Sequence, residues 1–171
     1  MKTVNYGWQQ RLRELYDKAQ VKYRNENRKV ETMFTPREVG VLRAFGAKPM
    51  ELYDYAEDSS DLDWETALLI TAARRDYFLH EQKGVWSEKT IKIEELPPKD
   101  AQLEGIAWLP RIIDKAKARL RGELPNDLMY CCGGDRKFFR AHDLHPADFL
   151  RLVWSAKGKQ EKIVEYVKRG G

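Results

Sequence analysis

Hydrophobic residues recur at steps of three and four along most of this chain, with charged residues between them, and this spacing marks one face of an α-helix. Thr35, Pro36 and Glu38 form a capping box that starts one such segment. Asp63 is the expected cap of another, whose apolar middle, ALLITAA, predicts a central buried helix. The first half therefore predicts helices over residues 7–29, from Pro36 to Gly46, from Pro49 to the turn at Ser59, and over residues 64–82.

The second half returns to the helical pattern after a break. Thr90–Ile93 alternates polar and apolar residues, which predicts a short strand or an extended segment, and Pro97-Pro98 is the strongest interruption in the chain. Further helices are expected over residues 110–121, 136–142, 146–156 and 160–168. We expect a mainly α protein, with a helical N-terminal half packed on a small helical C-terminal domain. The expected divisions are the half at 1–90, a proline-containing linker at 91–104 and the C-terminal domain at 105–171.

The composition favours a folded globular protein: 42% of the 171 residues are hydrophobic and 34% are charged. No run of apolar residues is long enough for a transmembrane helix, and the N-terminus lacks the apolar segment of a signal peptide. The two cysteines are adjacent, so no disulfide framework is expected. These features predict a cytoplasmic protein without a membrane partner.

Charge is distributed unevenly. The net charge of +4 is too small to indicate a nucleic-acid partner, and the aromatic residues fall on apolar stripes rather than between basic residues. Residues 1–30 hold eight Lys or Arg against three Asp or Glu, whereas residues 51–65 hold seven acidic residues and no Lys or Arg. These segments are either two solvated faces or complementary faces, within one chain or between the chains of a homo-oligomer.

The segment GIAWLPRIIDKAKARLR, residues 105–121, predicts an amphipathic helix with an apolar stripe on one side and basic residues on the other. A cysteine-bearing, glycine-rich turn follows at 130–136. Cys132 precedes a predicted helix whose first turn carries Arg136, and a helix N-terminus with nearby cations favours a thiolate. The alternative is a buried cysteine in a turn whose Asp135 caps the helix.

From about residue 94 to 171, the chain resembles the bacterial domain of unknown function 5069 family. The resemblance rests on Leu96-Pro97-Pro98, the run WLPRIIDKAKA at 108–118, Cys132, Asp135-Arg136, Phe138-Phe139 and Asp148-Phe149-Leu150. The family usually has an Asn-Cys-Pro-Leu-Asp type of turn, where this chain reads Cys-Cys-Gly-Gly-Asp at 131–135. The two glycines allow a looser turn or a closer approach of a ligand. The resemblance implies no activity, and the N-terminal half is not recognised.

Three further groups are candidates. Asp114 either faces a pocket with Cys132 or forms an ion pair within its own helix. Arg74-Arg75-Asp76 interrupts an apolar helix, so these charges should be paired, with an acidic ligand or with the 51–65 stretch. Asp76 and His80 share a helix face, but spacing fixes only these two ligands, so no metal site is expected.

Two functions fit these observations. The first is a small-molecule binder or small enzyme, taking a small anionic ligand at the junction of the two halves; no cofactor is assigned. Its catalytic candidates are Cys132, Asp114 and Asp135, and its ligand-binding candidates are Trp108, Arg111, Arg136 and Arg75. The alternative is a non-catalytic protein that interacts with a partner or assembles with itself through its basic and acidic faces.

Overall fold

In the computed structural model, which describes residues 7–171, helices account for most of the chain, and the expected mainly α fold is confirmed. The helices are α1 (Trp8–Arg24), α2 (Pro36–Ala44), α3 (Pro49–Glu57), α4 (Trp64–His80), α5 (Leu109–Arg121), α6 (Gly133–Ala141), α7 (Pro146–Ala156) and α8 (Gln160–Arg169). Short 3-10 turns occur at Val30–Thr32 and Ile93–Glu95. None of the helices in the described part is long and apolar enough to cross a membrane.

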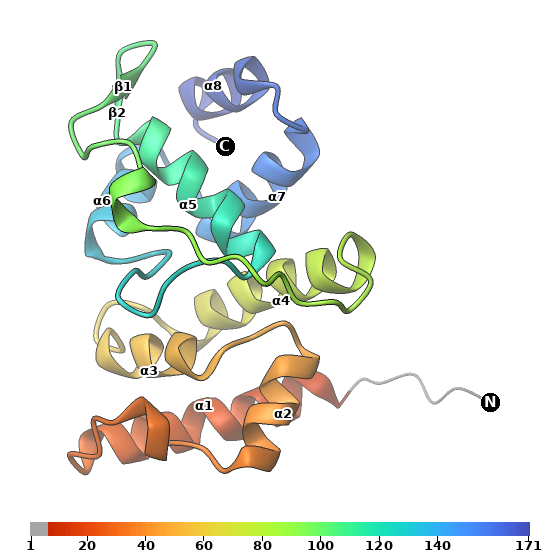
Figure 1. Ribbon diagram of the computed structural model, residues 1–171. Helices are drawn as coiled ribbons and strands as arrows, with labels where there is room; N and C mark the ends of the chain where they lie inside the picture. The colour runs from red at the N-terminus through yellow and green to blue at the C-terminus, as the bar shows by residue number, and fades with distance from the viewer. Residues whose placement is uncertain (1–6) are drawn as a thin grey trace.

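The helices form layers that rise from α1 and α2, through α3 and α4, to α5–α8 (Figure 1). Helix α1 packs on α3, and α4 packs on α5 and α7. The N-terminal layers enclose one hydrophobic cluster, which includes Leu12, Met33 and Leu42. A larger cluster joins Ile70 and Ala73 of α4 to apolar residues of α5–α8. The larger core therefore draws on residues from both sides of the 91–104 segment.

Local signals explain most helix boundaries. Thr35 and Glu38 form the predicted capping box at the start of α2, and the Asp63 carboxylate accepts a hydrogen bond from the Thr66 N–H at 2.8 Å at the start of α4. Helix α1 ends at Arg24, five residues before the expected end, because Glu26 adopts a left-handed conformation with φ of 63°. Helix α6 begins at Gly133 rather than at Arg136.

The segment between α4 and α5 runs along α5 (Figure 1). Of the two forms expected near residues 90–93, a short strand or an extended segment, the strand is absent, and Lys92 has an extended backbone. The Ile91 N–H donates to the Glu123 carbonyl at 2.9 Å. A two-stranded antiparallel hairpin follows instead, with β1 (Gln102–Leu103) paired to β2 (Ile106–Ala107) in the register Gln102↔Ala107 and Leu103↔Ile106. Glu104 and Gly105 both have positive φ in its turn, which suits the right-handed twist of paired strands.

Arg74 was expected to pair with an acidic ligand or with the 51–65 stretch, but its hydrogen-bond partners in the structure are uncharged. Its guanidinium is fully buried in α4 but pairs with oxygen atoms of amides, not with carboxylates. It donates to the carbonyls of Gly46 at 2.9 Å and Leu120 at 2.5 Å, and to the Gln82 side chain at 2.5 Å. Burial lowers the pKa of Arg74 to about 10, with the nearby Arg119 adding to the effect. Arg74 therefore ties α4 to the end of α5 and to the α2–α3 loop.

Candidate functional site

The turn before α6 is organised around the Asp135 carboxylate. Cys131 has a left-handed backbone, with φ of 69°, and this turns its N–H toward Asp135 Oδ2 at 2.9 Å. Cys132 then occupies the N-cap position of α6, and Asp135 lies in the first turn of that helix. The Asp135 side chain is completely buried, so its negative charge needs partners from elsewhere in the chain.

Lys115 of α5 supplies the compensating charge. Its Nζ lies 2.5 Å from Asp135 Oδ2, and its side chain is 1% exposed. The other carboxylate oxygen, Oδ1, accepts a hydrogen bond from Trp108 Nε1 at 2.9 Å. Lys115 Nζ also lies 3.4 Å from Cys132 Sγ. A buried charge pair is tolerated when both partners are also hydrogen-bonded, and this arrangement meets that condition for Asp135.

The indole of Trp108 packs against the backbone of Gly134. A Cβ atom at position 134 would lie only 2.6 Å from Trp108 Cζ2 and 2.7 Å from Cη2. Trp108 itself precedes α5 with a left-handed backbone, with φ of 71°, which directs its side chain back over the turn. The close approach of a tryptophan therefore accounts for the glycine at position 134.

A cleft of about 660 Å³ lies beside this turn, and we call it the α3–α5 cleft. A volume of this size is in the range of small-molecule sites. One wall comes from α3 with Met50, Asp54, Glu57 and Asp58, and the opposite wall comes from Trp108, Arg111, Lys115, Cys132 and Gly134. The remaining lining residues belong to the two connecting segments and are Ile93, Lys99, Asn126, Asp127, Leu128 and Met129.

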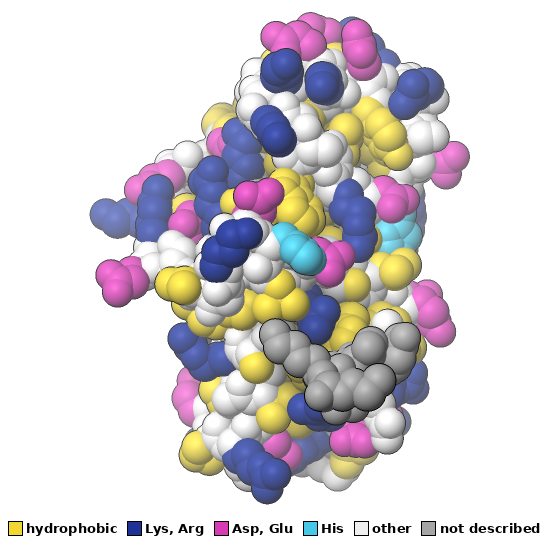
Figure 2. Space-filling model, turned by 90° about the vertical axis from the view of Figure 1, so that its right-hand side faces the viewer, with side chains coloured by type: hydrophobic (Ala, Val, Ile, Leu, Met, Phe, Trp, Pro, Cys, Tyr) yellow, Lys and Arg dark blue, Asp and Glu magenta, His cyan; other side chains and the backbone are white. Residues whose placement is uncertain are grey.

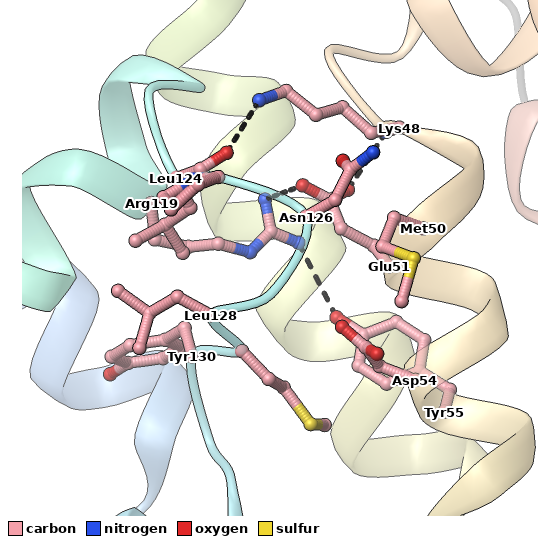
Figure 3. A pocket seen from close by; sticks show the side chains of 12 residues that line it. Lys48, Met50, Glu51, Asp54, Tyr55, Arg119, Leu124, Asn126, Leu128 and Tyr130 are labelled. Atoms are coloured by element: carbon pink, nitrogen blue, oxygen red, sulfur yellow. Dashed lines mark hydrogen bonds and ion pairs between the residues drawn. The ribbon is translucent and has the colours of Figure 1, made fainter. Parts of the chain in front are cut away.

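Asp54 lies where the cleft meets a small adjoining cavity of about 20 Å³, which has room for a water molecule (Figure 3). In this cavity Arg119 pairs with Glu51 at 3.0 Å and donates to the Tyr55 hydroxyl at 3.3 Å. Asp54 has no hydrogen bond or ion pair from its side chain to another described residue. Burial raises the pKa of Asp54 to about 7, and repulsion from Glu51, Glu57 and Asp58 adds to the rise.

Ion pairs hold the acidic stretch against α6. Arg136 contacts Asp58 at 2.8 Å and Asp61 at 2.7 Å, and Arg140 contacts Asp61 at 2.6 Å. These contacts join the end of α3 and the loop after it to the C-terminal helices. They therefore set the position of the acidic wall of the cleft relative to Cys132.

The structure gathers several of the sequence-predicted site residues. Trp108, Arg111 and Cys132 line the cleft, and Asp135 lies buried beneath it. Arg136 pairs with the acidic stretch beside the cleft. Cys132 is partly exposed, whereas the neighbouring Cys131 is buried and burial raises the pKa of its thiol to about 12. Cys132 is therefore the cysteine that a molecule in the cleft can reach.

Two other predicted residues lie elsewhere. Asp114 is not part of the cleft lining; it contacts Lys117 at 3.4 Å and faces two grooves on another side of α5. Because successive residues of a helix point about 100° apart, Asp114 and Lys115 cannot share one face. Arg75 is also absent from the cleft and packs its guanidinium over the Trp8 ring, 4.7 Å from the centroid.

The basic side of α5 is buried, although its sequence suggested a solvated face. Arg111, Lys115 and Arg119 are 8%, 1% and 2% exposed. Their four-residue spacing places them in one row, and each meets a different partner: the Pro97 carbonyl, Asp135 or Glu51. Of the basic residues of α5, Arg121 is exposed and Lys117 is partly exposed.

Sequence reasoning missed Lys115 and Asp54 as site residues. The spacing in the sequence shows that Lys115 lies in the same helical row as Arg111. It does not show that Lys115 pairs with Asp135, which lies 20 residues further along the chain. Asp54 was one of seven acidic residues in its stretch, and nothing in the sequence separates it from those that form ion pairs. In the described part of the chain, no group of three or more His, Cys, Asp or Glu residues is arranged to hold a metal ion.

Comparison with known proteins identifies the C-terminal part only. Residues 96–171 match the model of a family described as a domain of unknown function (DUF5069), which confirms the resemblance seen in the sequence. No curated protein and no solved structure matches the chain. The matched residues include the Lys115–Asp135 pair and one wall of the cleft, whereas the α3 wall lies outside them.

Replacing Lys115 with methionine should strongly destabilise the protein. The substitution leaves the Asp135 charge buried without a counter-ion, which typically costs about 3–5 kcal/mol of unfolding free energy. Denaturant titration measures the loss. The double variant Lys115→Met/Asp135→Asn should recover part of it, because the uncompensated charge is gone. A single variant within about 1 kcal/mol of wild type would contradict a structural role for this pair.

Gly134→Ala should destabilise the protein by about 1–3 kcal/mol, because its Cβ overlaps the Trp108 ring. Gly40→Ala is the matched control: Gly40 is also helical, and its added Cβ would meet no atom within 4 Å. That control should be neutral or stabilising by up to about 1 kcal/mol. Equal effects of the two substitutions in thermal or chemical unfolding would show that the Trp108–Gly134 approach is not tight.

Asp54 should lower the free energy of unfolding as the pH rises from about 4 to 7. Its pKa is raised to about 7 in the folded state, so the folded state binds more protons than the unfolded state in this range. Comparing wild type with Asp54→Asn at each pH isolates the effect, which should stay below about 4 kcal/mol. Asp61→Asn is a control of opposite sign, because Arg140 and Arg136 lower the pKa of Asp61. Parallel pH profiles for wild type and Asp54→Asn would contradict the expectation.

Proposed function

We propose that the protein binds a small polar molecule in the α3–α5 cleft. The observation that carries this proposal is a cleft of about 660 Å³ whose floor holds a buried ammonium, Lys115, beside a reachable thiol, Cys132. The Lys115–Asp135 pair and the packing of Trp108 on Gly134 hold this floor in one geometry. A preorganised cleft with a few convergent polar groups is the usual form of a small-molecule site.

Arg111 is well placed to contribute to binding. It lines the cleft and donates one hydrogen bond, to the Pro97 carbonyl at 2.9 Å, but forms no ion pair with a carboxylate among the described residues. A guanidinium has five N–H donors, so further donors are available to an anionic group of a ligand. Lys99 on the rim adds a second positive charge.

The assembly alternative has less support. Glu51, Asp58 and Asp61, which would supply an acidic docking face, form ion pairs with arginines of the same chain. On the face shown in Figure 2, charged side chains of both signs are interspersed and no large patch of one sign appears. Neither feature suits recognition of an oppositely charged partner.

A thermal-shift screen with native mass spectrometry tests the proposed function. The probes are a panel of amino acids, organic acids, sugar phosphates and nucleotides. At about 100 times its dissociation constant, a ligand should stabilise the folded state by about 2.7 kcal/mol. For a protein of this size, that corresponds to a rise in melting temperature of about 5–10 °C. The bound compound should also appear as added mass on the native protein.

Two variants locate the binding. Arg111→Ala should weaken it, whereas Lys117→Ala, which changes a cation on another side of the same helix, should leave it unchanged. A bound compound should also slow alkylation of Cys132 by iodoacetamide. The proposed function would be contradicted if no compound of the panel binds. It would also be contradicted if a compound binds but Arg111→Ala does not weaken its binding and the bound compound does not slow alkylation of Cys132.

A further inference from the structure

The two walls of the α3–α5 cleft carry opposite charge. The α3 wall presents Asp54, Glu57 and Asp58. Across the cleft, Arg111 and Lys115 come from α5, and Lys99 comes from the segment before β1. A pocket with one acidic and one basic wall distinguishes the two ends of a molecule that lies across it, because each end meets a different potential.

Not all of these charges are already paired within the protein. Asp58 is bound to Arg136 at 2.8 Å, and Arg119 is engaged by Glu51 at 3.0 Å. Asp54, by contrast, forms no ion pair with the described residues, and neither does Arg111. Asp54 and Arg111 therefore face the cleft from opposite walls without an ion pair. Glu57, Asp127 and Lys99 also line the cleft without an ion pair among the described residues, but Asp54 and Arg111 are more buried than these three.

Lys115 provides a second observation that favours an anionic group at the basic wall of the cleft. Its ammonium carries three N–H donors and is almost completely buried, yet among residues 7–171 its side-chain partners are two: Asp135 at 2.5 Å and the weakly accepting sulfur of Cys132 at 3.4 Å. Lys115 also lines the cleft. A buried donor without a partner is costly, so an anionic group in the cleft gains a partner that is already dehydrated and in place.

Asp54 provides the corresponding indication at the acidic end. Burial and the carboxylates of Glu51, Glu57 and Asp58 disfavour its ionised form and together outweigh the opposing effect of Arg119, because the net effect is a raised pKa. Figure 3 shows Asp54 beside the Glu51–Arg119 and Tyr55 contacts, in the small cavity that adjoins the cleft. An ammonium or guanidinium group of a ligand would relieve this repulsion.

We propose that the ligand of the α3–α5 cleft is zwitterionic, with a basic nitrogen that pairs with Asp54 and a carboxylate or phosphate that pairs with Arg111 and Lys115. This inference rests on the proposed function, and it specifies the chemical class of the bound molecule. Amino acids and short peptides are the simplest molecules of this class. Binding both groups at once fixes the orientation of the ligand across the cleft.

Matched ligands and variants test the proposal. The probes are the twenty amino acids and a set of dipeptides, each compared by calorimetry with its N-acetylated analogue, which lacks the cation, and its C-amidated analogue, which lacks the anion. Each analogue should bind at least about tenfold more weakly than its parent, the equivalent of one lost charged contact. Near pH 7, binding of the parent should release protons, because pairing with a cation favours the ionised form of Asp54.

The variants assign each end of the ligand. Asp54→Asn should weaken binding of the parent about tenfold but leave the N-acetylated analogue unaffected, because the contact that it removes is already absent. Arg111→Gln should weaken binding of the parent about tenfold but leave binding of the C-amidated analogue unaffected. Glu65→Gln and Lys117→Gln, which change exposed or partly exposed charges outside the cleft, should leave every affinity unchanged.

The results that overturn this inference differ from those that overturn the proposed function. If an amino acid or dipeptide binds but its N-acetylated or C-amidated analogue binds equally well, the ligand is not recognised as a zwitterion. The same conclusion follows if organic acids, sugar phosphates or nucleotides bind in the cleft and no amino acid or dipeptide does. In both cases the cleft remains a binding site. If no compound of either panel binds, both the zwitterion and the binding function are wrong.

Discussion

The buried ion pair between Lys115 and Asp135 is the interaction on which the geometry of the cleft depends. Each charge would be expensive alone in the interior, so the two helices that carry them, α5 and α6, are tied at this point. Asp135 also accepts hydrogen bonds from the Trp108 indole and from the Cys131 backbone, which fixes the entry to α5 and the turn before α6. A single carboxylate thereby positions the tryptophan and the lysine of one wall, and the turn that carries Cys132.

The opposite wall is positioned by charge as well, but through exposed and partly buried pairs. Arg136 and Arg140 hold the loop after α3, while Arg119 holds the α3 helix itself through Glu51. Exposed pairs of this kind contribute little stability singly and are weakened by salt. The α3 wall is therefore held by two kinds of contact, a largely buried pair at Glu51 and pairs at Asp58 and Asp61 that compete more with solvent.

The sequence predicted the helices well, because caps, prolines and terminal glycines are local signals. It also predicted that Trp108, Arg111 and the Cys132 turn belong to one region, because they lie within one motif. The burial of Arg111, Lys115 and Arg119 on α5 could not be predicted. An amphipathic pattern separates apolar from charged residues, but it does not show whether the charged side of the helix packs against distant parts of the chain. The same limit applies to Asp114, whose direction depends on the rotation of α5 about its axis.

Helix α4 belongs to the N-terminal half of the sequence but packs against α5 and α7, within the larger core. The family match begins at residue 96, well after α4 ends. The matched domain therefore has an apolar surface that it does not itself cover. In this chain α4 covers that apolar surface, and α3, from the same N-terminal half, supplies the second wall of the cleft. The N-terminal half therefore acts twice, as the cover of an apolar face that the matched residues would otherwise expose and as half of the lining of the cleft.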